Sequence, residues 1–345
     1  MDRATARRRR VAFVVLALAA LLGLASGIAL GAAPGEQRTP QLEVRMARLL
    51  TPAQLAGERL VAGVTGTAIS PQLRQAIPRP RGLRAPLLVM VDQEGGQVVR
   101  LAGAPTVSAQ VMGERGGAFS RRQGRLAAAN LRDVGANVDL APVLDVARPG
   151  GVIAETERAF GTTPRQVATT AVPFARGLEA GGVVATAKHF PGLGAASENT
   201  DFAVQEIDLP EARLRLVDES PYEAFVRAGG RMVMLSTAIY PAFSEVPAAF
   251  SRAIATGELR RRLGFRGVSI TDALETVAVD AFGGPGQAGV AAARAGVDLL
   301  LFVDLAGAEA AHRALLAKLR SGDLDRAESL AAAGRVLDLR AELPR

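Results

Sequence analysis

The sequence contains no cysteine and no tryptophan, and only two histidines and two lysines occur among its 345 residues. The absence of cysteine excludes disulfide bonds, thiolate catalysis and zinc sites with cysteine ligands. Two histidines cannot supply a histidine-rich metal site, and the sequence shows no carboxylate motif for Mg²⁺ or Ca²⁺. Aromatic residues make up 4% of the chain, which leaves little surface for stacking nucleic acid bases. We therefore expect no cysteine-ligated or histidine-rich metal site and no nucleic acid partner, while carboxylate-bound Mg²⁺ or Ca²⁺ stays open.

Basic residues are nearly all arginine, and the net charge of +7 is inflated by the N-terminus. The first 33 residues contain five Arg and one Asp, so the remainder holds 36 basic and 33 acidic residues. With 49% hydrophobic and 22% charged residues, the chain has the composition of a globular protein with a substantial core. The length allows one large α/β barrel or two domains.

The N-terminus combines positive charge with a long apolar run. Four consecutive arginines, at positions 7–10, precede 23 uncharged residues at positions 11–33. A basic segment before an apolar run is typical of export signals, and this run is long enough to span a bilayer. Because the positive flank stays in the cytoplasm, the rest of the chain is expected to be exported. We predict a signal peptide or membrane anchor at 1–33, a linker at 34–45 and a single domain at 46–345.

Apolar runs alternate with helical patterns throughout the predicted domain. The clearest expected strands are residues 86–91, 182–187, 231–237, 267–271 and 297–303. Strands alternating with helices imply a parallel sheet with right-handed crossovers. Polar residues directly follow the strands, as they do at the active-site face of a TIM-like (β/α)8 barrel, and we predict this fold. An open doubly wound sheet is the alternative, but no Gly-x-Gly-x-x-Gly loop follows a first strand.

The stretch from Lys188 to Asp201 is the main candidate site, because a rare lysine, a rare histidine and carboxylates converge on one short loop. Carboxylates at strand ends, with Lys, Arg and His around them, suit glycoside hydrolysis. One carboxylate serves as nucleophile or base, and Asp272 is the best candidate for it. Structural roles are the alternatives: Asp272 could cap a helix, Asp92 could sit in a turn and Lys188 could face solvent. For Asp145 we favour a structural role, in which it bonds backbone amides.

Five short motifs occur in order along the domain: residues 91–100 with Asp-Gln-Glu-Gly-Gly, 140–146 with Ala-Pro-Val-Leu-Asp, 158–161 with Arg-Ala-Phe-Gly, 188–194 with Lys-His-Phe-Pro-Gly, and 271–274 with Thr-Asp-Ala-Leu. Together they resemble glycoside hydrolase family 3, specifically its bacterial β-N-acetylglucosaminidases that trim cell-wall sugars. The resemblance implies a TIM-like barrel, no metal or organic cofactor, and a retaining, two-step hydrolysis of β-glycosides of peptidoglycan fragments. We expect a carbohydrate substrate and a monomer.

The resemblance assigns roles to individual residues. Asp272 matches the family nucleophile, although the second Asp of that family motif is Ala273 in this chain. The positions that match residues holding the sugar in the first subsite are Asp92, Arg100, Arg158, Lys188 and His189.

The candidate loop departs from the family pattern in its second half. The family has a histidine where this chain has Leu193, and it has Asp-Ser-His where this chain has Asn199, Thr200 and Asp201. In the family that Asp–His pair supplies the general acid/base. Asp201 is therefore the candidate acid/base of this chain, with Glu198 as a possible helper, and it would need a pKa raised by burial.

Three alternatives follow from this departure. In the first, Asp201 acts as the acid/base. In the second, Asp272 works alone and only substrates with good leaving groups turn over, because general acid–base catalysis typically contributes about 10²–10⁴-fold. In the third, the protein binds wall sugars without hydrolysing them, as a membrane-tethered binding protein. A β-glycosidase of another specificity is a further alternative.

Overall fold

A central eight-stranded sheet organises the protein in the computed structural model, which describes residues 11–14, 47–65 and 86–343. Its strands run in the order β11-β8-β7-β6-β3-β1-β2-β12. Their bounds are β1 Val11–Val14, β2 Leu60–Thr65, β3 Val89–Val91, β6 Val138–Asp139, β7 Val184–Phe190, β8 Met232–Leu235, β11 Val268–Thr271 and β12 Leu300–Phe302. Two hairpins lie outside this sheet: β4 Gln93–Gly95 with β5 Val98–Val99, and β9 Ile239–Tyr240 with β10 Ser244–Pro247.

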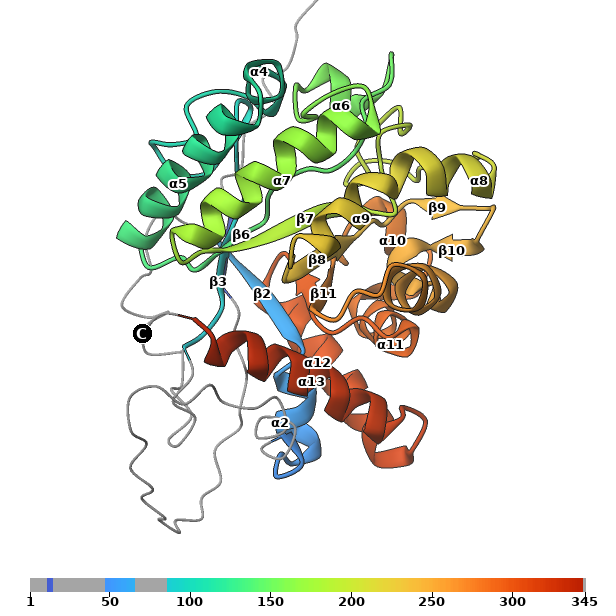
Figure 1. Ribbon diagram of the computed structural model, residues 1–345. Coiled ribbons are helices and arrows are strands. Elements are labelled where there is room, and N and C mark those ends of the chain that lie inside the picture. The colour runs from blue at the N-terminus through green and yellow to red at the C-terminus, as the bar shows by residue number, and fades with distance from the viewer. Residues whose placement is uncertain (1–10, 15–46, 66–85, 344–345) are drawn as a thin grey trace, which may run out of the picture.

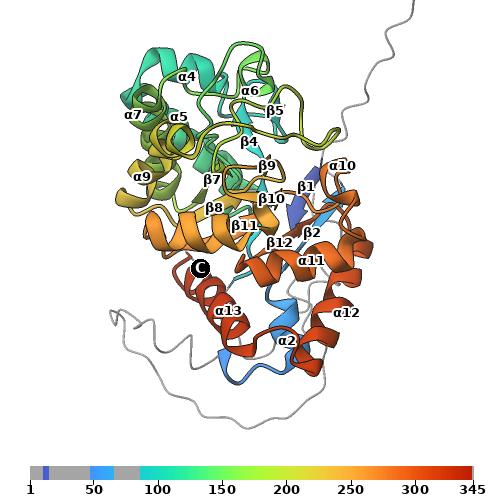
Figure 2. The ribbon, with the colours of Figure 1, turned by 90° about the vertical axis from the view of Figure 1, so that its right-hand side faces the viewer.

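Neighbouring strands of the sheet are parallel except around β1. Strand β1 pairs antiparallel with both β2 and β3, and Figure 2 shows it beside β2 and β12. The two end strands of the sheet are also joined, because Ile270 of β11 forms a parallel bridge with Leu299, directly before β12. The Leu274 amide then donates to the Leu301 carbonyl oxygen at 2.9 Å. The α/β class predicted from the alternating pattern is confirmed.

Helices follow most strands and cover the sheet. The α-helices are α2 Pro52–Gly57, α4 Ala109–Arg115, α5 Gly117–Asp133, α6 Val152–Glu155, α7 Pro164–Ala180, α8 Glu211–Arg213, α9 Ser220–Arg227, α10 Val277–Asp280, α11 Gly284–Ala295, α12 Leu305–Ser321 and α13 Arg326–Ala341. Leu214–Asp218 and Ala253–Arg262 are π-helical, and Ala248–Phe250 is a 3₁₀ turn. Helices α4, α5 and α7 lie together on one side, and α2, α12 and α13 lie together at the opposite end (Figure 1).

Two helices begin after a capping threonine. Thr51 accepts a hydrogen bond from the Gln54 amide and Thr163 accepts one from the Gln166 amide, and each is followed by a proline in the first turn. The linker predicted at 34–45 lies outside the described residues.

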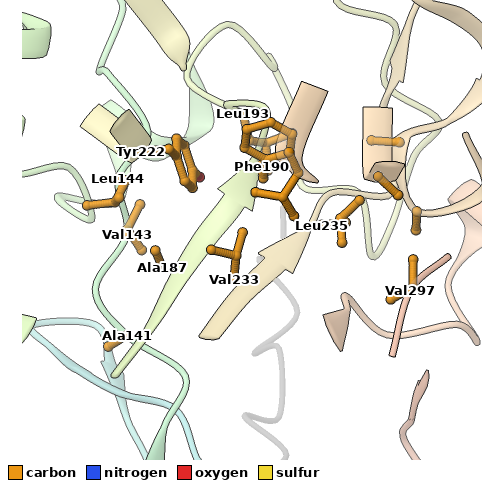
Figure 3. Close-up of a cluster of buried hydrophobic side chains, with 14 of the residues drawn as sticks. Ala141, Val143, Leu144, Ala187, Phe190, Leu193, Tyr222, Val233, Leu235 and Val297 are labelled. Atoms are coloured by element: carbon orange, nitrogen blue, oxygen red, sulfur yellow. The ribbon is translucent and has the colours of Figure 1, made fainter. Parts of the chain in front are cut away.

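Alternating positions along the strands face two separate apolar clusters, as the period of two in a β-strand requires. One cluster takes residues from strands all round the sheet, among them Met90, Val138, Val184, Met232 and Ile270, together with Val336 and Leu339 of α13. The other lies between the sheet and the surrounding helices. Figure 3 shows part of it, where Phe190 packs edge-on against Tyr222 with ring centroids 5.1 Å apart.

The apolar run predicted to be a signal peptide or anchor begins with β1, and residues 15–33 lie outside the described part of the chain. Among the described residues, no helix has the length and apolar character that crossing a membrane needs.

Candidate active site

The predicted site residues gather at the C-terminal ends of the parallel strands. Asp92 directly follows β3, and Asp272 directly follows β11. Lys188 and His189 lie near the C-terminal end of β7, and Asp145 lies in the segment after β6. Because β3, β6, β7 and β11 run parallel within one sheet, their C-terminal ends lie at the same edge. The structure therefore brings together residues that are up to 180 positions apart in the sequence.

Lys188 lies at the centre of a buried ionic cluster. Its Nζ is 2.6 Å from Asp92 Oδ1 and 2.7 Å from Glu94 Oε1. Its side chain is only 3% exposed, so it does not face solvent. Burial alone would lower the pKa of Lys188, but the charges of Asp92 and Glu94 raise it above its ordinary value. Lys188 is therefore a fixed cation at the strand end.

Glu94 is a site residue that sequence reasoning missed. It lies in β4, and Arg158 donates to it in bidentate geometry, with Nε–Oε2 and Nη2–Oε1 distances of 2.8 Å. Burial tends to raise the pKa of Glu94, but the charges of Arg158 and Lys188 outweigh burial and lower it. The same pairing raises the pKa of Arg158 despite its desolvation. Glu94 thus holds Arg158 and Lys188 in place, while Asp92 is the more exposed carboxylate of the cluster, at 13%.

His189 is oriented by Asp145. Its Nδ1 lies 2.8 Å from Asp145 Oδ2, and its backbone amide donates to Asp145 Oδ1 at 3.1 Å. The Leu193 amide donates to the same oxygen at 2.7 Å. Asp145 is fully buried and bonds two backbone amides, which agrees with the structural role expected for it. With Nδ1 engaged by Asp145, Nε2 is the ring atom available to a ligand.

Arg100 lies directly after β5, and its backbone amide donates to Gln93 Oε1 at 3.1 Å. Its Nε is buried and has no hydrogen-bond partner within the described part of the chain. An unpaired buried donor is costly in a folded protein, so a ligand acceptor is a natural partner for it. The sugar-binding role of Arg100 stays a prediction.

Asp272 is held by the backbone around it. Its amide donates to the Leu235 carbonyl oxygen of β8 at 2.9 Å, and its Oδ1 accepts from the Ala273 amide at 2.9 Å. It does not cap a helix, because Thr276 is the N-cap of the next helix, α10. The structural role considered for Asp272 is therefore wrong. The residue is half-buried and presents a carboxylate at the sheet edge.

Asp201 is an exposed residue of the loop between β7 and α8, yet its carboxyl responds to the groups of the site. Desolvation by the surrounding protein and the negative charge of Asp272 raise its pKa above the ordinary value. Asn199, His189 and Arg158 act in the opposite direction. Asn199 also shapes the turn, because its Oδ1 accepts from the Asp201 amide at 3.0 Å and its Nδ2 donates to Asp201 Oδ2 at 3.1 Å.

The family's loop histidine is replaced by Leu193, which is 3% exposed and lies next to Phe190 in the apolar cluster of Figure 3. The flanking glycines leave no room for larger residues. A Cβ on Gly194 would lie 1.9 Å from the Val146 carbonyl oxygen, and Gly192 has a positive φ of 139°. Leu193 therefore contributes to the packing of the apolar cluster.

The site as a whole has two carboxylates that influence each other, Asp201 and Asp272, beside the cationic cluster of Lys188 and Arg158. Asp272 is held by backbone hydrogen bonds, and the pKa of Asp201 is raised above its ordinary value. Such a pair can combine a nucleophile with a general acid.

The family of the chain follows from a match along most of its length. The model described as "Glycosyl hydrolase family 3 N terminal domain" matches residues 47–339. The chain belongs to glycosyl hydrolase family 3. The resemblance inferred from the five motifs is thus confirmed.

Named relatives agree with this family. The chain is 41% identical over 266 residues to an "Uncharacterized secreted glycosyl hydrolase" of Arthroderma benhamiae, a match that covers 75% of each chain. A β-N-acetylhexosaminidase structure from Beutenbergia cavernae superposes with a TM-score of 0.74 at 32% identity, over 87% of this chain and 98% of that one. A family 3 β-N-acetylglucosaminidase from Paenibacillus sp. gives 0.73 at 32% identity. That match covers 85% of this chain but only 55% of the Paenibacillus chain, so this protein spans about half of its length.

Proposed function

We propose that this family 3 protein is a retaining β-glycoside hydrolase, specifically an exo-β-N-acetylglucosaminidase that acts on peptidoglycan-derived sugars within a TIM-like (β/α)8 barrel. The observation that carries the proposal is that Asp92, Lys188 and Asp272 lie at the C-terminal ends of parallel strands of one sheet, with Lys188 Nζ 2.6 Å from Asp92 Oδ1. Support for the N-acetylglucosaminide comes from the solved relatives, whose names specify β-N-acetylhexosaminidase and β-N-acetylglucosaminidase activity.

In the first step, the Asp272 carboxylate attacks the anomeric carbon and the bond to the leaving-group oxygen breaks. Asp201, whose pKa is raised by desolvation and by the charge of Asp272, gives a proton to that oxygen in this proposal. In the second step, Asp201 takes a proton from water, and the water oxygen replaces Asp272 at the anomeric carbon. Two displacements retain the β configuration, and the two carboxyls need to approach within about 5–5.5 Å for this chemistry.

The cationic cluster positions the sugar for these steps. In this proposal Asp92 accepts from sugar hydroxyls, and Arg100, Arg158 and His189 donate to the same sugar. The unpartnered Arg100 Nε and the orientation of His189 by Asp145 support these roles. Because Glu94 and Lys188 hold this arrangement rigidly, little reorganisation accompanies sugar binding. Such charge-assisted hydrogen bonds are about twice as strong as neutral ones.

The protein is proposed to act outside the cytoplasm, with residues 1–33 as signal peptide or anchor, 34–45 as linker and 46–345 as the hydrolase domain. The Arthroderma relative is named as secreted, which supports export. Cleavage or membrane insertion of residues 1–33 would withdraw β1 from its place between β2 and β3. We expect a carbohydrate partner and a monomeric protein.

The test is an assay with a β-N-acetylglucosaminide disaccharide, whose sugar leaving group requires acid assistance. We expect turnover by the wild type, initial release of the β anomer by NMR, and at least about 10⁴-fold loss in Asp272→Ala. Asp323→Ala is the matched control, because this exposed aspartate pairs with Lys318 on the connection between α12 and α13. Initial release of the α anomer, or full activity in Asp272→Ala, would contradict the double displacement.

A second candidate function is sugar binding without hydrolysis, and the burial of Leu193 in place of the family's histidine favours it. Calorimetry distinguishes the two candidates. Tight binding of a muropeptide by the wild type, with no product after long incubation, would support the binding protein and overturn the hydrolase.

A further inference from the structure

Glu275 lies three residues after Asp272 and has no part in the proposed steps. Its side chain reaches the end of the neighbouring strand β12, where its Oε2 accepts a hydrogen bond from the Val303 amide. The backbone amide and the side-chain carboxyl of Asp304 also form hydrogen bonds with the Glu275 carboxyl. Glu275 is half-buried, and it joins the segment that carries Asp272 to the start of α12.

The start of α12 is shaped to receive this carboxyl. Asp304 is the N-cap of α12 and accepts from the Gly307 amide at 2.8 Å. A Cβ added to Gly307 would lie 1.5 Å from Glu275 Oε1, so any larger residue there would displace Glu275. The main chain reinforces the same link, because the Leu274 amide donates to Leu301 at 2.9 Å. The Asp272 segment is thus fastened to β12 and α12 at two successive residues.

Burial and the negative charge of Asp304 raise the pKa of Glu275 to about 7, although the Val303 amide acts against them. Among the described residues, Asp304 is the charged group that acts on Glu275. The side-chain hydrogen bond between Glu275 and Asp304 needs a proton, and it also raises the pKa of Glu275.

We propose that Glu275 is a positioning residue for Asp272: its carboxyl accepts from the Val303 amide, lies against Gly307, and so fastens the Asp272 segment to the start of α12. The inference rests on the proposed role of Asp272 as nucleophile. Two adjacent carboxylates repel each other when both are ionised. Because a displacement of about 1 Å at a reacting group can cost about 10²-fold in rate, release of this contact slows the attack of Asp272. Activity then falls as the pH rises through neutrality.

The first test measures kcat/KM between pH 6 and 8 with an aryl β-N-acetylglucosaminide that has a good leaving group. Such a substrate needs no general acid, so ionisation of Asp201 leaves the rate unchanged. A single ionisation near pH 7 lets the wild-type value fall up to about tenfold over this range. Glu275→Gln keeps an oxygen acceptor for the Val303 amide but cannot ionise, so we expect a flat profile. The same decline in Glu275→Gln as in the wild type overturns the proposal.

The second test displaces Glu275 without altering it. We expect Gly307→Ala to lower kcat about 10–100-fold, because the new Cβ occupies the position of Glu275 Oε1. Gly286→Ala in α11 is the matched control, since its Cβ meets its nearest neighbours at an ordinary 3.4 Å. Gly307→Ala/Glu275→Ala is expected to be no slower than Glu275→Ala alone. Additive losses in this cycle would show that Gly307 acts elsewhere and would overturn the positioning role.

Thermal unfolding separates this inference from the proposed hydrolysis. The pKa of Glu275 is about 7 in the folded protein against an ordinary 4.5, so the folded state binds the extra proton between these values. Wild-type stability is therefore lost as the pH rises from 5 to 8, and Glu275→Gln escapes this loss. We expect the difference in Tm between Glu275→Gln and wild type to grow over that range. A constant difference overturns the inference, whereas a growing difference in a protein that hydrolyses no glycoside supports the contact and refutes only the hydrolase.

Discussion

The two halves of the loop that follows β7 differ in how they are held. In the first half, Lys188 and His189 are buried, and each is bonded to carboxylates from other strand ends. In the second half, Glu198 and Asp201 are exposed, and Phe202 is 76% exposed. The second half is held mainly by short-range contacts, such as the Gln205 Oε1 atom that accepts from Ser197 and Glu198 amides at 3.1 and 3.2 Å.

In the proposed mechanism, this difference separates sugar binding from proton transfer. A binding subsite gains from rigidity, because preorganised charges cost no reorganisation when the ligand arrives. An acid/base on an exposed loop can close over the substrate, exclude water and then reopen for product release. The first half therefore suits recognition of the sugar, and the second suits a group that serves both leaving group and water in turn.

Asp201→Asn is expected to have the largest effect, and it tests whether Asp201 is the general acid. We expect a loss of about 10²–10⁴-fold in kcat/KM for a disaccharide and little loss for an aryl glycoside with a good leaving group, because only the former needs a proton. The raised pKa of Asp201 also sets a pH dependence of the wild type: the rate with the disaccharide falls as the pH rises through that pKa. Rates for both substrates across pH 4–8 check this. An equal loss on both substrates would assign Asp201 to something other than acid catalysis.

Lys188→Met tests how firmly the first half of the loop is held. The substitution leaves Asp92 and Glu94 buried beside each other without their shared cation, and breaking such a buried pair typically costs about 3–5 kcal/mol of stability. Chemical denaturation measures the change. Asp201→Asn in the same assay is the contrast, with a change of less than about 0.5 kcal/mol expected for an exposed loop residue. Similar costs at both positions would remove the distinction between the two halves.

The site residues differ in how well they could be predicted from the sequence. Lys188 and His189 could be predicted as site residues, because they are rare in the chain and end a buried strand. Glu94 was missed because β4 and β5 have three and two residues, too few to show a periodic pattern. Glu275 was missed because its partners lie at positions 303–307, a pairing set by the packing of β12 beside β11. Asp201 could be found by counting along the loop, but its approach to Asp272 depends on tertiary structure.

Leu193→His asks whether the family's histidine can be restored in this loop. Leu193 is packed beside Phe190, so an imidazole there would be buried without a designed partner, at a cost of about 1–3 kcal/mol in stability. We expect no gain in kcat for the disaccharide, because the side chain at this position contributes to packing. Denaturation and steady-state kinetics together check both statements. A gain in kcat would mean that the first half of the loop also takes part in proton transfer.

The smallest expected effect is that of Phe202→Ser, directly after Asp201. A phenylalanine that is 76% exposed buries little apolar area, so its replacement is expected to change the free energy of unfolding by less than about 0.5 kcal/mol. Phe190→Ser is the contrast, because Phe190 is fully buried and large-to-small changes of this kind cost about 3–5 kcal/mol. Chemical denaturation of the two variants measures the ratio. A cost for Phe202→Ser close to that for Phe190→Ser would show that the second half of the loop is packed as firmly as the first. The proposed difference between a rigid first half and a mobile second half would then not hold.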